Sequence, residues 1–201
     1  MNIILSTRNP SKAEQIKALF NNPNITIQTL ADVGIEGEAT EDSLTLYGNA
    51  LKKALFAKEF SNPKDWVMAE DTGIFIDALN GDPGVYSARW AGEGASTEDV
   101  LKYCLKKMEG ISNRAATFET TVVVIDPKGA TFVFIGSVRG HLLTAPKVSP
   151  QPKMPYSGIF MPEGINLVWA EMSVEQENAI SHRGKAFGKA KTFLENILKQ
   201  E

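Results

Sequence analysis

A chain of 201 residues with 43% hydrophobic content can bury a sizeable core as one domain, or as one domain divided into two lobes around a cleft. Its formal charge is −3 and its basic residues are scattered, so no patch is suited to a nucleic-acid backbone or an anionic membrane. One cysteine excludes an internal disulfide and two histidines are too few for a zinc cluster, so any catalytic metal must bind oxygen ligands.

The first part of the chain alternates predicted strands and helices. Asn2 to Leu5 reads as a buried strand, and a helix follows with Asn9 as its N-cap and Pro10 in its first turn. The apolar face of this helix is formed by Ala13, Ile16, Leu19 and Phe20. This alternation favours the α/β class.

A second strand and a second helix continue the same pattern. The strand covers Ile25 to Leu30, and an acidic loop leads from it to a helix from about Leu46 to Phe60. The apolar stripe of this helix consists of Ala50, Leu51, Ala54, Leu55 and Ala57. We then expect two short strands, 66–71 and 74–79, separated by Thr72 and Gly73.

The second half of the chain begins with a long, glycine-rich loop, 80–92, of a kind that belongs beside a functional site. Ser96 and Asp99 predict a capping box for a helix that ends near Gly110. Segments 117–126 and 130–143 predict a hairpin whose length would carry the sheet into a second lobe. A last helix is expected from about Gly184 to Leu198.

No apolar run approaches the roughly 20 residues of a membrane span, and the first ten residues lack the features of a signal peptide. We therefore expect a soluble, cytoplasmic protein of the α/β class, residues 1–201 forming a single domain. Its partner should be a small molecule, with no nucleic acid and no membrane.

The first candidate site is the segment STRNPSK, residues 6–12, where a strand end meets a helix N-terminus. Free backbone N–H groups and the positive end of the helix dipole attract phosphate, and Lys12 adds a full charge. The spacing is not that of a P-loop. An ordinary helix cap remains an alternative explanation of the same residues.

The second candidate is an acidic set formed by Glu41, Glu70 and Asp71. Neighbouring acids at a strand end are costly unless a positive group lies between them, and oxygen ligands of this kind suit Mg²⁺. Solvated loop charges are the alternative. Lys53, on the intervening helix, could face the core, the cleft or solvent.

The third candidate is SHRG, residues 181–184, a polar turn that opens the last helix. His182 and Arg183 supply donors suited to the carbonyl and ring-nitrogen acceptors of a base, if the turn faces a pocket. A helix cap at Ser181 and a surface charge at Arg183 are the alternative.

These segments together resemble the inosine triphosphate pyrophosphatase family over nearly the whole chain. STRNPSK is similar to a T-x-N-x-x-K opening, and TLYGNALKKA (45–54) is similar to T-F-x-E-N-A-x-x-K-A. The long segments DALNGDPGVYSARWAG and ISHRGKA, together with AEDTG, are specific enough to make a chance match implausible.

The resemblance implies a mixed, elongated sheet with flanking helices, in two lobes around a central substrate cleft, and usually a homodimer. It also implies hydrolysis of non-standard purine nucleoside triphosphates (ITP, dITP and XTP) to a monophosphate and pyrophosphate, as a house-cleaning step for the nucleotide pool. Mg²⁺ is the implied cofactor.

The resemblance carries roles over to matched positions. By this carry-over Thr7, Asn9, Lys12 and Lys53 bind the triphosphate, with Thr72 nearby. Glu41 and Asp71 hold the metal, and Asp71 activates the attacking water. The base is read by His182 and Arg183, with Tyr156 and Ser157 also on the substrate side.

The departures from the family pattern lie where the base is read. The usual G-F-G-Y-D-P-I-F is KMPYSGIF (153–160) here, which places Met154 at the stacking position and Ser157 at the position of an acid. Glu177 replaces a lysine, and Gly48 replaces a glutamate. Either a hydrogen bond has moved within a purine pocket, or a different base is admitted.

Three other functions remain open at this point. The first is a pyrophosphatase with shifted base specificity, acting on modified pyrimidine or other altered nucleotides. The second is a weakly active nucleotide-binding regulatory protein, against which the intact set of Lys12, Glu41, Lys53 and Asp71 argues. In the third, residues 154–158 have become a partner surface.

Overall fold

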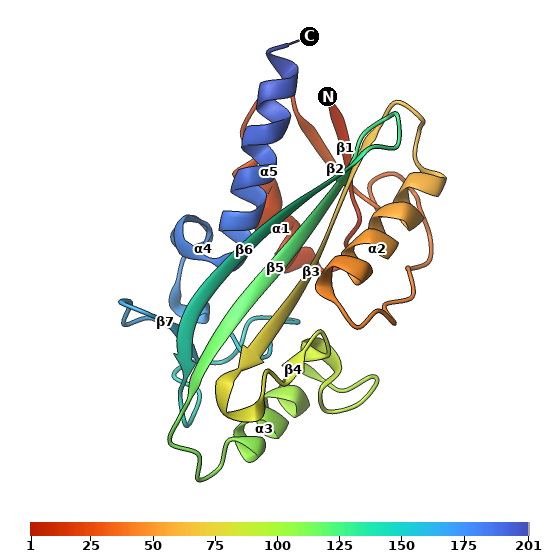
Figure 1. Ribbon diagram of the computed structural model, residues 1–201. Helices are drawn as coiled ribbons and strands as arrows, with labels where there is room; N and C mark the ends of the chain where they lie inside the picture. Colours follow the sequence, from red (N-terminus) through yellow and green to blue (C-terminus); the bar gives the residue numbers. More distant parts are fainter. Residues whose placement is uncertain (201) are drawn as a thin grey trace.

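The computed structural model describes residues 1–200 and is built around one long, twisted β-sheet (Figure 1). The strands follow the order β2 (Thr26–Thr29), β1 (Asn2–Leu5), β3 (Trp66–Ile76), β5 (Ala115–Ile125), β6 (Thr131–Leu142) and β7 (Phe160–Pro162), and β4 (Pro83–Gly84) pairs with β3. β1 runs parallel to β2 and β3, and the remaining pairs are antiparallel. The prediction of an α/β fold with a mixed, elongated sheet is confirmed.

Helices cover both faces of the sheet at the end where the two termini lie (Figure 1). α1 (Pro10–Leu19) and α5 (His182–Leu198) pack on one face, and α2 (Leu46–Phe60) packs on the other. The short α4 (Val174–Ile180) precedes α5. We call this part, with β1, β2 and the adjoining halves of β3, β5 and β6, the first lobe.

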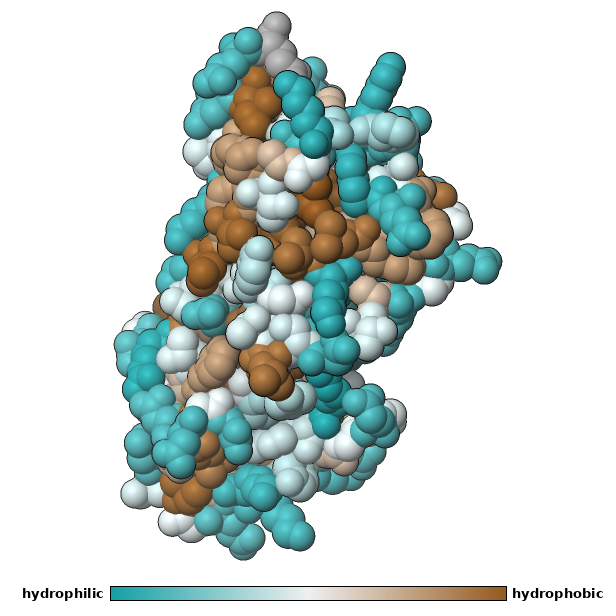
Figure 2. Space-filling view, turned by 45° about the vertical axis from the view of Figure 1, so that its right-hand side comes forward, coloured by the Kyte–Doolittle hydropathy of each residue, from teal (hydrophilic) through white to brown (hydrophobic). Residues whose placement is uncertain are grey.

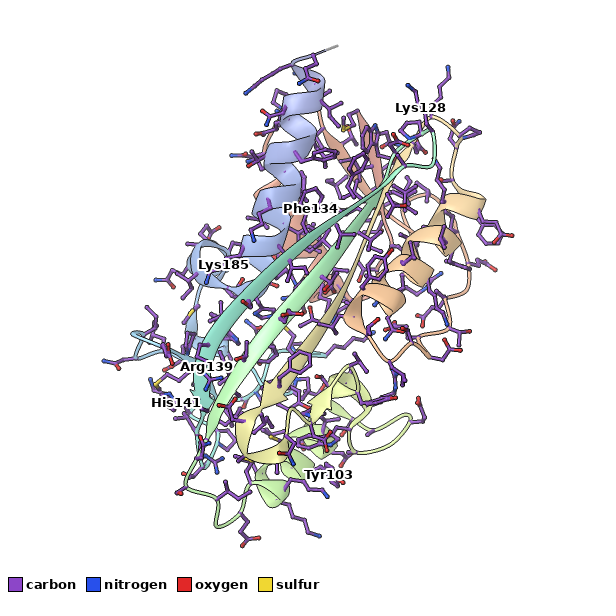
Figure 3. All side chains as sticks on the ribbon, in the orientation of Figure 1. Tyr103, Lys128, Phe134, Arg139, His141 and Lys185 are labelled. Atoms are coloured by element: carbon purple, nitrogen blue, oxygen red, sulfur yellow. The ribbon has the colours of Figure 1, made fainter. Side chains whose placement is uncertain are left out.

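The two helical layers follow from the alternation of side chains along the strands. In β3, Trp66 and Met68 belong to the apolar cluster under α1 and α5, whereas Val67 and Ala69 belong to the cluster under α2. Phe134 of β6 packs against the first of these clusters and faces α5 (Figure 3). Because helices cover both faces of β3 in this lobe, its first four residues, 66–69, are all apolar.

A second lobe forms where β3, β5 and β6 continue beyond the helices of the first lobe. Its core contains Ile74 and Ile76 of β3, Phe118 of β5, and Leu101 and Cys104 of α3 (Thr97–Lys107). Figure 1 shows α3 and β4 at this end of the long strands. The same three strands therefore hold both lobes together.

Several local predictions are confirmed. Asn9 caps α1 with its side chain, and Ser96 and Asp99 form the capping box of α3. The predicted hairpin is present as β5 and β6, and its turn is marked by Lys128 in Figure 3. The last helix begins at His182, two residues before the expected start.

Two predictions were wrong. Residues 66–76 form one continuous strand and not two, because Thr72 and Gly73 lie within the β3 ladder with β5. Gly73 serves close packing: a Cβ there would lie 2.7 Å from the Gly84 oxygen of β4. Leu55, expected in the apolar stripe of α2, is 53% exposed.

No helix among residues 1–200 is both long and apolar enough to cross a membrane. Exposed apolar side chains are nevertheless present on the surface of the first lobe, where Figure 2 shows them gathered on one face. Val133 and Ile135, which alternate along β6, are 43% and 48% exposed.

Candidate active site

The loop from β1 to α1 forms one wall of a polar cavity. The Asn9 side chain accepts hydrogen bonds from the backbone N–H groups of Ser11 (3.1 Å) and Lys12 (3.3 Å), and the Thr7 hydroxyl accepts one from Asn9 N–H (3.2 Å). Thr7, Asn9 and Lys12 all line the cavity. The helix N-terminus and the Lys12 charge thus face the same space, an arrangement suited to an anion.

Lys12 is also the partner of a buried carboxylate at the end of the same cavity. Its Nζ lies 2.5 Å from Glu70 Oε1, and Glu70 Oε2 accepts a hydrogen bond from the Thr72 hydroxyl at 2.6 Å. Burial by itself would raise the pKa of Glu70, but the charges of Lys12, Arg183 and Lys53 outweigh it and hold that pKa well below its ordinary value. Glu70 is therefore ionised in the folded protein.

On the other side of β3, Lys53 of α2 bridges two carboxylates. Its Nζ lies 3.1 Å from Glu41 Oε2 and 3.1 Å from Asp71 Oδ1, and the Asn49 side chain donates to Asp71 Oδ2 at 3.1 Å. Burial opposes the charge on Lys53, yet the surrounding carboxylates, first Asp71, raise its pKa above the ordinary value. Burial also raises the pKa of Asp71, against the opposing charges of Lys53 and Lys12.

Glu41 and Asp71 are the residues here that could hold a divalent cation. No cluster of three acidic, histidine or cysteine side chains suited to a metal occurs within residues 1–200. Two carboxylates already converging on one ammonium group nevertheless present hard oxygen ligands to a single point, and Mg²⁺ needs only one or two of them when waters and substrate phosphates complete its shell. The residues present fit that ion.

A second cavity, with apolar walls, adjoins the first. Its lining includes Phe118, Trp169, Met154 and Tyr156. His182 lies stacked on Phe118, with ring centroids 4.7 Å apart and planes inclined by 16°. A cavity lined by aromatic side chains suits a planar ligand.

Three residues in the walls of this second cavity carry buried polar atoms without a partner. Arg183 is 3% exposed and donates from Nη1 to Gln15 Oε1 at 2.6 Å, but its Nε has no partner within residues 1–200. The Nδ1 of His182 and the Nε1 of Trp169 are likewise buried without a partner in this part of the chain. Arg183 Nε and Trp169 Nε1 are donors, whereas Nδ1 of a neutral imidazole donates or accepts according to its tautomer. Because unsatisfied buried polar atoms cost free energy, they mark a place where a ligand can supply partners.

His182 is uncharged in this setting. Burial, followed by the positive charge of Arg183, lowers its pKa well below the ordinary value. The other histidine, His141, lies near the end of β6, away from both cavities (Figure 3). Only His182 can therefore take part in the site.

Met154, Ser157 and Glu177, at which the sequence departs from the family pattern, line this cavity too, whereas the fourth such residue, Gly48, lies in α2 and lines neither cavity. The Ser157 hydroxyl accepts from Gln151 N–H (2.8 Å) and donates to the Met154 oxygen (2.7 Å), so it closes a turn in its own segment. The Tyr156 hydroxyl donates to the Ser87 oxygen at 2.8 Å. Glu177 is 2% exposed, and burial raises its pKa.

All the predicted site residues lie in or beside the two cavities, which meet at Lys12 and Lys153. Sequence reasoning missed several neighbours that hold or line the site: Gln15, Asn49, Phe118, Thr120, Lys153 and Trp169. Asn49 and Gln15 lie one helical turn from Lys53 and Lys12 respectively, and that spacing was the available signal. The other four are brought in only by the fold.

The sequence of the whole chain is similar to those of known proteins. The chain is 38% identical to the dITP/XTP pyrophosphatase of Thermoanaerobacter pseudethanolicus over 203 residues, covering all of both chains. It is 34% identical to the dITP/XTP pyrophosphatase of Clostridium tetani, covering 99% of this chain and 98% of the other.

Solved structures give the same result. The structure is similar to the Ham1 protein of Staphylococcus aureus, with a TM-score of 0.82 at 30% identity and coverage of 98% and 99% of the two chains. It is also similar to the HAM1 protein of Coxiella burnetii, with a TM-score of 0.85 at 27% identity and the same coverage. The sequence model of the Ham1 family matches residues 3–193, and the chain therefore belongs to the Ham1 family.

Proposed function

We propose that the chain hydrolyses non-standard purine nucleoside triphosphates, ITP, dITP and XTP, to a nucleoside monophosphate and pyrophosphate. The observation that carries the proposal is the junction, at Lys12 and Lys153, of a cavity lined by aromatic side chains with a polar cavity that contains several basic side chains. A nucleotide has the same division into a planar base and a charged phosphate chain. The names of the relatives, dITP/XTP pyrophosphatase, support the same substrate class.

In this proposal the triphosphate lies across the N-terminus of α1. Thr7 and Asn9 hold the loop, the positive end of the α1 dipole and Lys12 attract the phosphates, and Lys53 contributes a second positive charge. Both lysines are already paired with buried carboxylates, so their positions are fixed before the substrate binds.

Glu41 and Asp71 would hold Mg²⁺, which when bound offsets the charge of the phosphates. Asp71 accepts the proton of the attacking water. Asn49 and Lys53 fix its two oxygens, which positions the carboxylate for that proton transfer. Thr72 holds Glu70 by a hydrogen bond and lines the aromatic cavity on the substrate side.

The base is selected by the unpaired donors of the aromatic cavity. A 6-oxo purine offers carbonyl and ring-nitrogen acceptors to Arg183 and to the neutral His182, whereas adenine presents a donor at carbon 6. Tyr156 and Ser157 support the wall of the cavity through the backbone bonds described above.

A panel of nucleoside triphosphates, assayed separately for pyrophosphate and orthophosphate with and without Mg²⁺, tests the proposal. ITP, dITP and XTP should release pyrophosphate faster than ATP and the pyrimidine triphosphates. Faster turnover of a modified pyrimidine triphosphate would favour the shifted-specificity enzyme instead. Tight binding without turnover would favour the regulatory protein, and orthophosphate as the first product would exclude the proposed reaction.

We also infer a homodimer that acts in the cytoplasm, where the nucleotide pool lies. The exposed apolar side chains of Val133 and Ile135 in β6 support an interface between copies. Sedimentation of the wild-type protein and of a Val133→Lys, Ile135→Glu variant tests it. The variant should sediment as a monomer, and a monomeric wild type would contradict the inference.

A further inference from the structure

Lys153 differs from the other two lysines of the cleft in having an unpaired charge. It lines both cavities, as does Lys12. Lys12 is bound to Glu70, and Lys53 to Glu41 and Asp71. No acidic side chain within residues 1–200 lies at ion-pair distance from Lys153.

The turn that carries Lys153 is held against the start of α1. The Ser11 hydroxyl donates to the Pro152 backbone oxygen at 3.5 Å. Ser11 immediately precedes Lys12 in the chain, and Pro152 immediately precedes Lys153. Within the turn, Met154 N–H donates to the Gln151 oxygen at 3.0 Å, and the Ser157 hydroxyl joins Gln151 to Met154. These contacts fix the backbone of Lys153 beside the phosphate-binding loop.

Lys153 also occupies a backbone conformation that lysine rarely adopts. Its φ is +58°, in the left-handed region that favours glycine. Within residues 1–200 the only other non-glycine residue with positive φ is Asn80 (φ +54°), a residue type that tolerates this region and lines neither cavity. A strained lysine at a ligand cavity is a pattern that points to function.

We propose that Lys153 binds the α-phosphate of the substrate. This inference rests on the proposed function: with the base in the aromatic cavity and the β- and γ-phosphates in the polar one, the ribose and the α-phosphate occupy the junction. Lys153 is the unpaired cation at that junction.

The charge of Lys153 then acts on the group that reacts. The water oxygen forms a bond to the α-phosphorus, and its proton passes to Asp71. The bond from the α-phosphorus to the bridging oxygen breaks, and pyrophosphate leaves with that electron pair. Lys153 offsets the negative charge on the α-phosphoryl oxygens throughout, without gaining or losing a proton.

The decisive variant is Lys153→Gly, because it removes the ammonium group and the backbone strain together. We expect the Tm of this variant to equal or exceed that of the wild type. IMP should bind about tenfold or more weakly, the loss expected for one charged hydrogen bond. Inosine, which has the same base and ribose but no phosphate, should bind with unchanged affinity, and kcat/KM for ITP should fall at least as much as the affinity for IMP.

Two further variants separate charge from backbone. Lys153→Arg should retain most of the affinity for IMP, whereas Lys153→Gln should lose it while keeping the strained backbone. Asn80→Gly is the matched control, since it relieves the same kind of strain outside the cleft and should change neither binding nor turnover.

Equal affinity of wild type and Lys153→Gly for IMP would overturn the proposal, whatever happens to turnover. So would an equal loss for IMP and inosine, because it would mean a distorted pocket. A wild type that releases no pyrophosphate, together with a Lys153→Gly variant that still loses IMP affinity, would refute the proposed function and leave the phosphate contact standing.

Discussion

Glu70 and Asp71 are consecutive in β3, yet their carboxylates lie on opposite faces of the sheet. Glu70 shares its face with Thr72 and Thr120 and pairs with Lys12 of α1, whereas Asp71 pairs with Lys53 and Asn49 of α2. Each acid therefore has its own lysine. The two carboxylates therefore contact different helices and can be changed independently.

Asp71→Asn should lower kcat for pyrophosphate release by about 10²- to 10⁴-fold, the usual contribution of a general base. The asparagine has nearly the same shape, so the circular dichroism spectrum and the Tm should change little. Asn49→Ala, which removes only the hydrogen bond to Asp71 Oδ2, should lose less activity. A folded Asp71→Asn enzyme with near-normal turnover would exclude Asp71 as the base.

Lys12→Met should destabilise the protein by about 3–5 kcal/mol, because it leaves Glu70 buried without its charge partner. The double variant Lys12→Met, Glu70→Gln should recover much of that loss, since no uncompensated charge remains. Urea unfolding of the wild type, Lys12→Met, Glu70→Gln and the double variant gives the coupling free energy between the two side chains. Additive effects would mean that the pair contributes nothing to stability.

The pKa of Glu70 also predicts how stability depends on pH. Its folded pKa lies below the ordinary value of 4.5, so the unfolded chain binds the proton more tightly. The stabilisation is complete above pH 4.5 and is lost as the pH falls below that value towards the folded pKa. Glu70→Gln should remove this contribution, which thermal unfolding between about pH 3 and 6 would detect as a shallower slope than in the wild type.

Glu177→Gln should have the opposite effect near neutral pH. Burial raises the folded pKa of Glu177, so its ionised form destabilises the fold above the ordinary pKa and the penalty disappears in acid. The variant should therefore have a higher Tm than the wild type at pH 7 and the same Tm near pH 4. If the carboxylate serves the substrate, the gain in stability should be accompanied by an altered ratio of ITP to XTP turnover.

Arg183→Ala should erase much of the preference for 6-oxo purines. A lost bidentate contact to a base edge removes about 1–3 kcal/mol of discrimination, or about 5- to 150-fold between ITP and ATP. Gln15→Ala, which removes the partner that orients Arg183, should give a smaller loss in the same direction. A wild type that already treats ITP, XTP and ATP alike would contradict this assignment before any variant is made.

The parts of the fold that depend on local signals could be predicted from the sequence. Neighbouring residues alone predict the helix caps at Asn9 and Ser96, the bounds of α2 and the hairpin of β5 and β6. The continuity of β3 could not, since a Thr-Gly pair reads as a turn. The pair stays in the strand because Gly73 lets β4 approach and because β5 pairs with the residues of β3 both before and after it.

The same division applies to the cleft. Lys12, Lys53, Asp71, His182 and Arg183 were found through motifs, but which of them meet was not evident. Side chains alternate between the two faces of β3, so Glu70 and Asp71 point to opposite faces of the sheet. His182 stacks on Phe118, which lies in β5, more than sixty residues earlier in the chain. Lys153 stands at a glycine of the family pattern, but only the structure shows its left-handed backbone and its position between the two cavities.

The unbroken strands have a mechanical consequence. β3, β5 and β6 remain paired from one lobe to the other, so continuous ladders of backbone hydrogen bonds connect the two lobes. Pulling the lobes apart along the strands would break many of these bonds together. The segment between β6 and β7, which contributes Lys153 and Met154 to the cavity wall, lies outside those ladders and can move without breaking them.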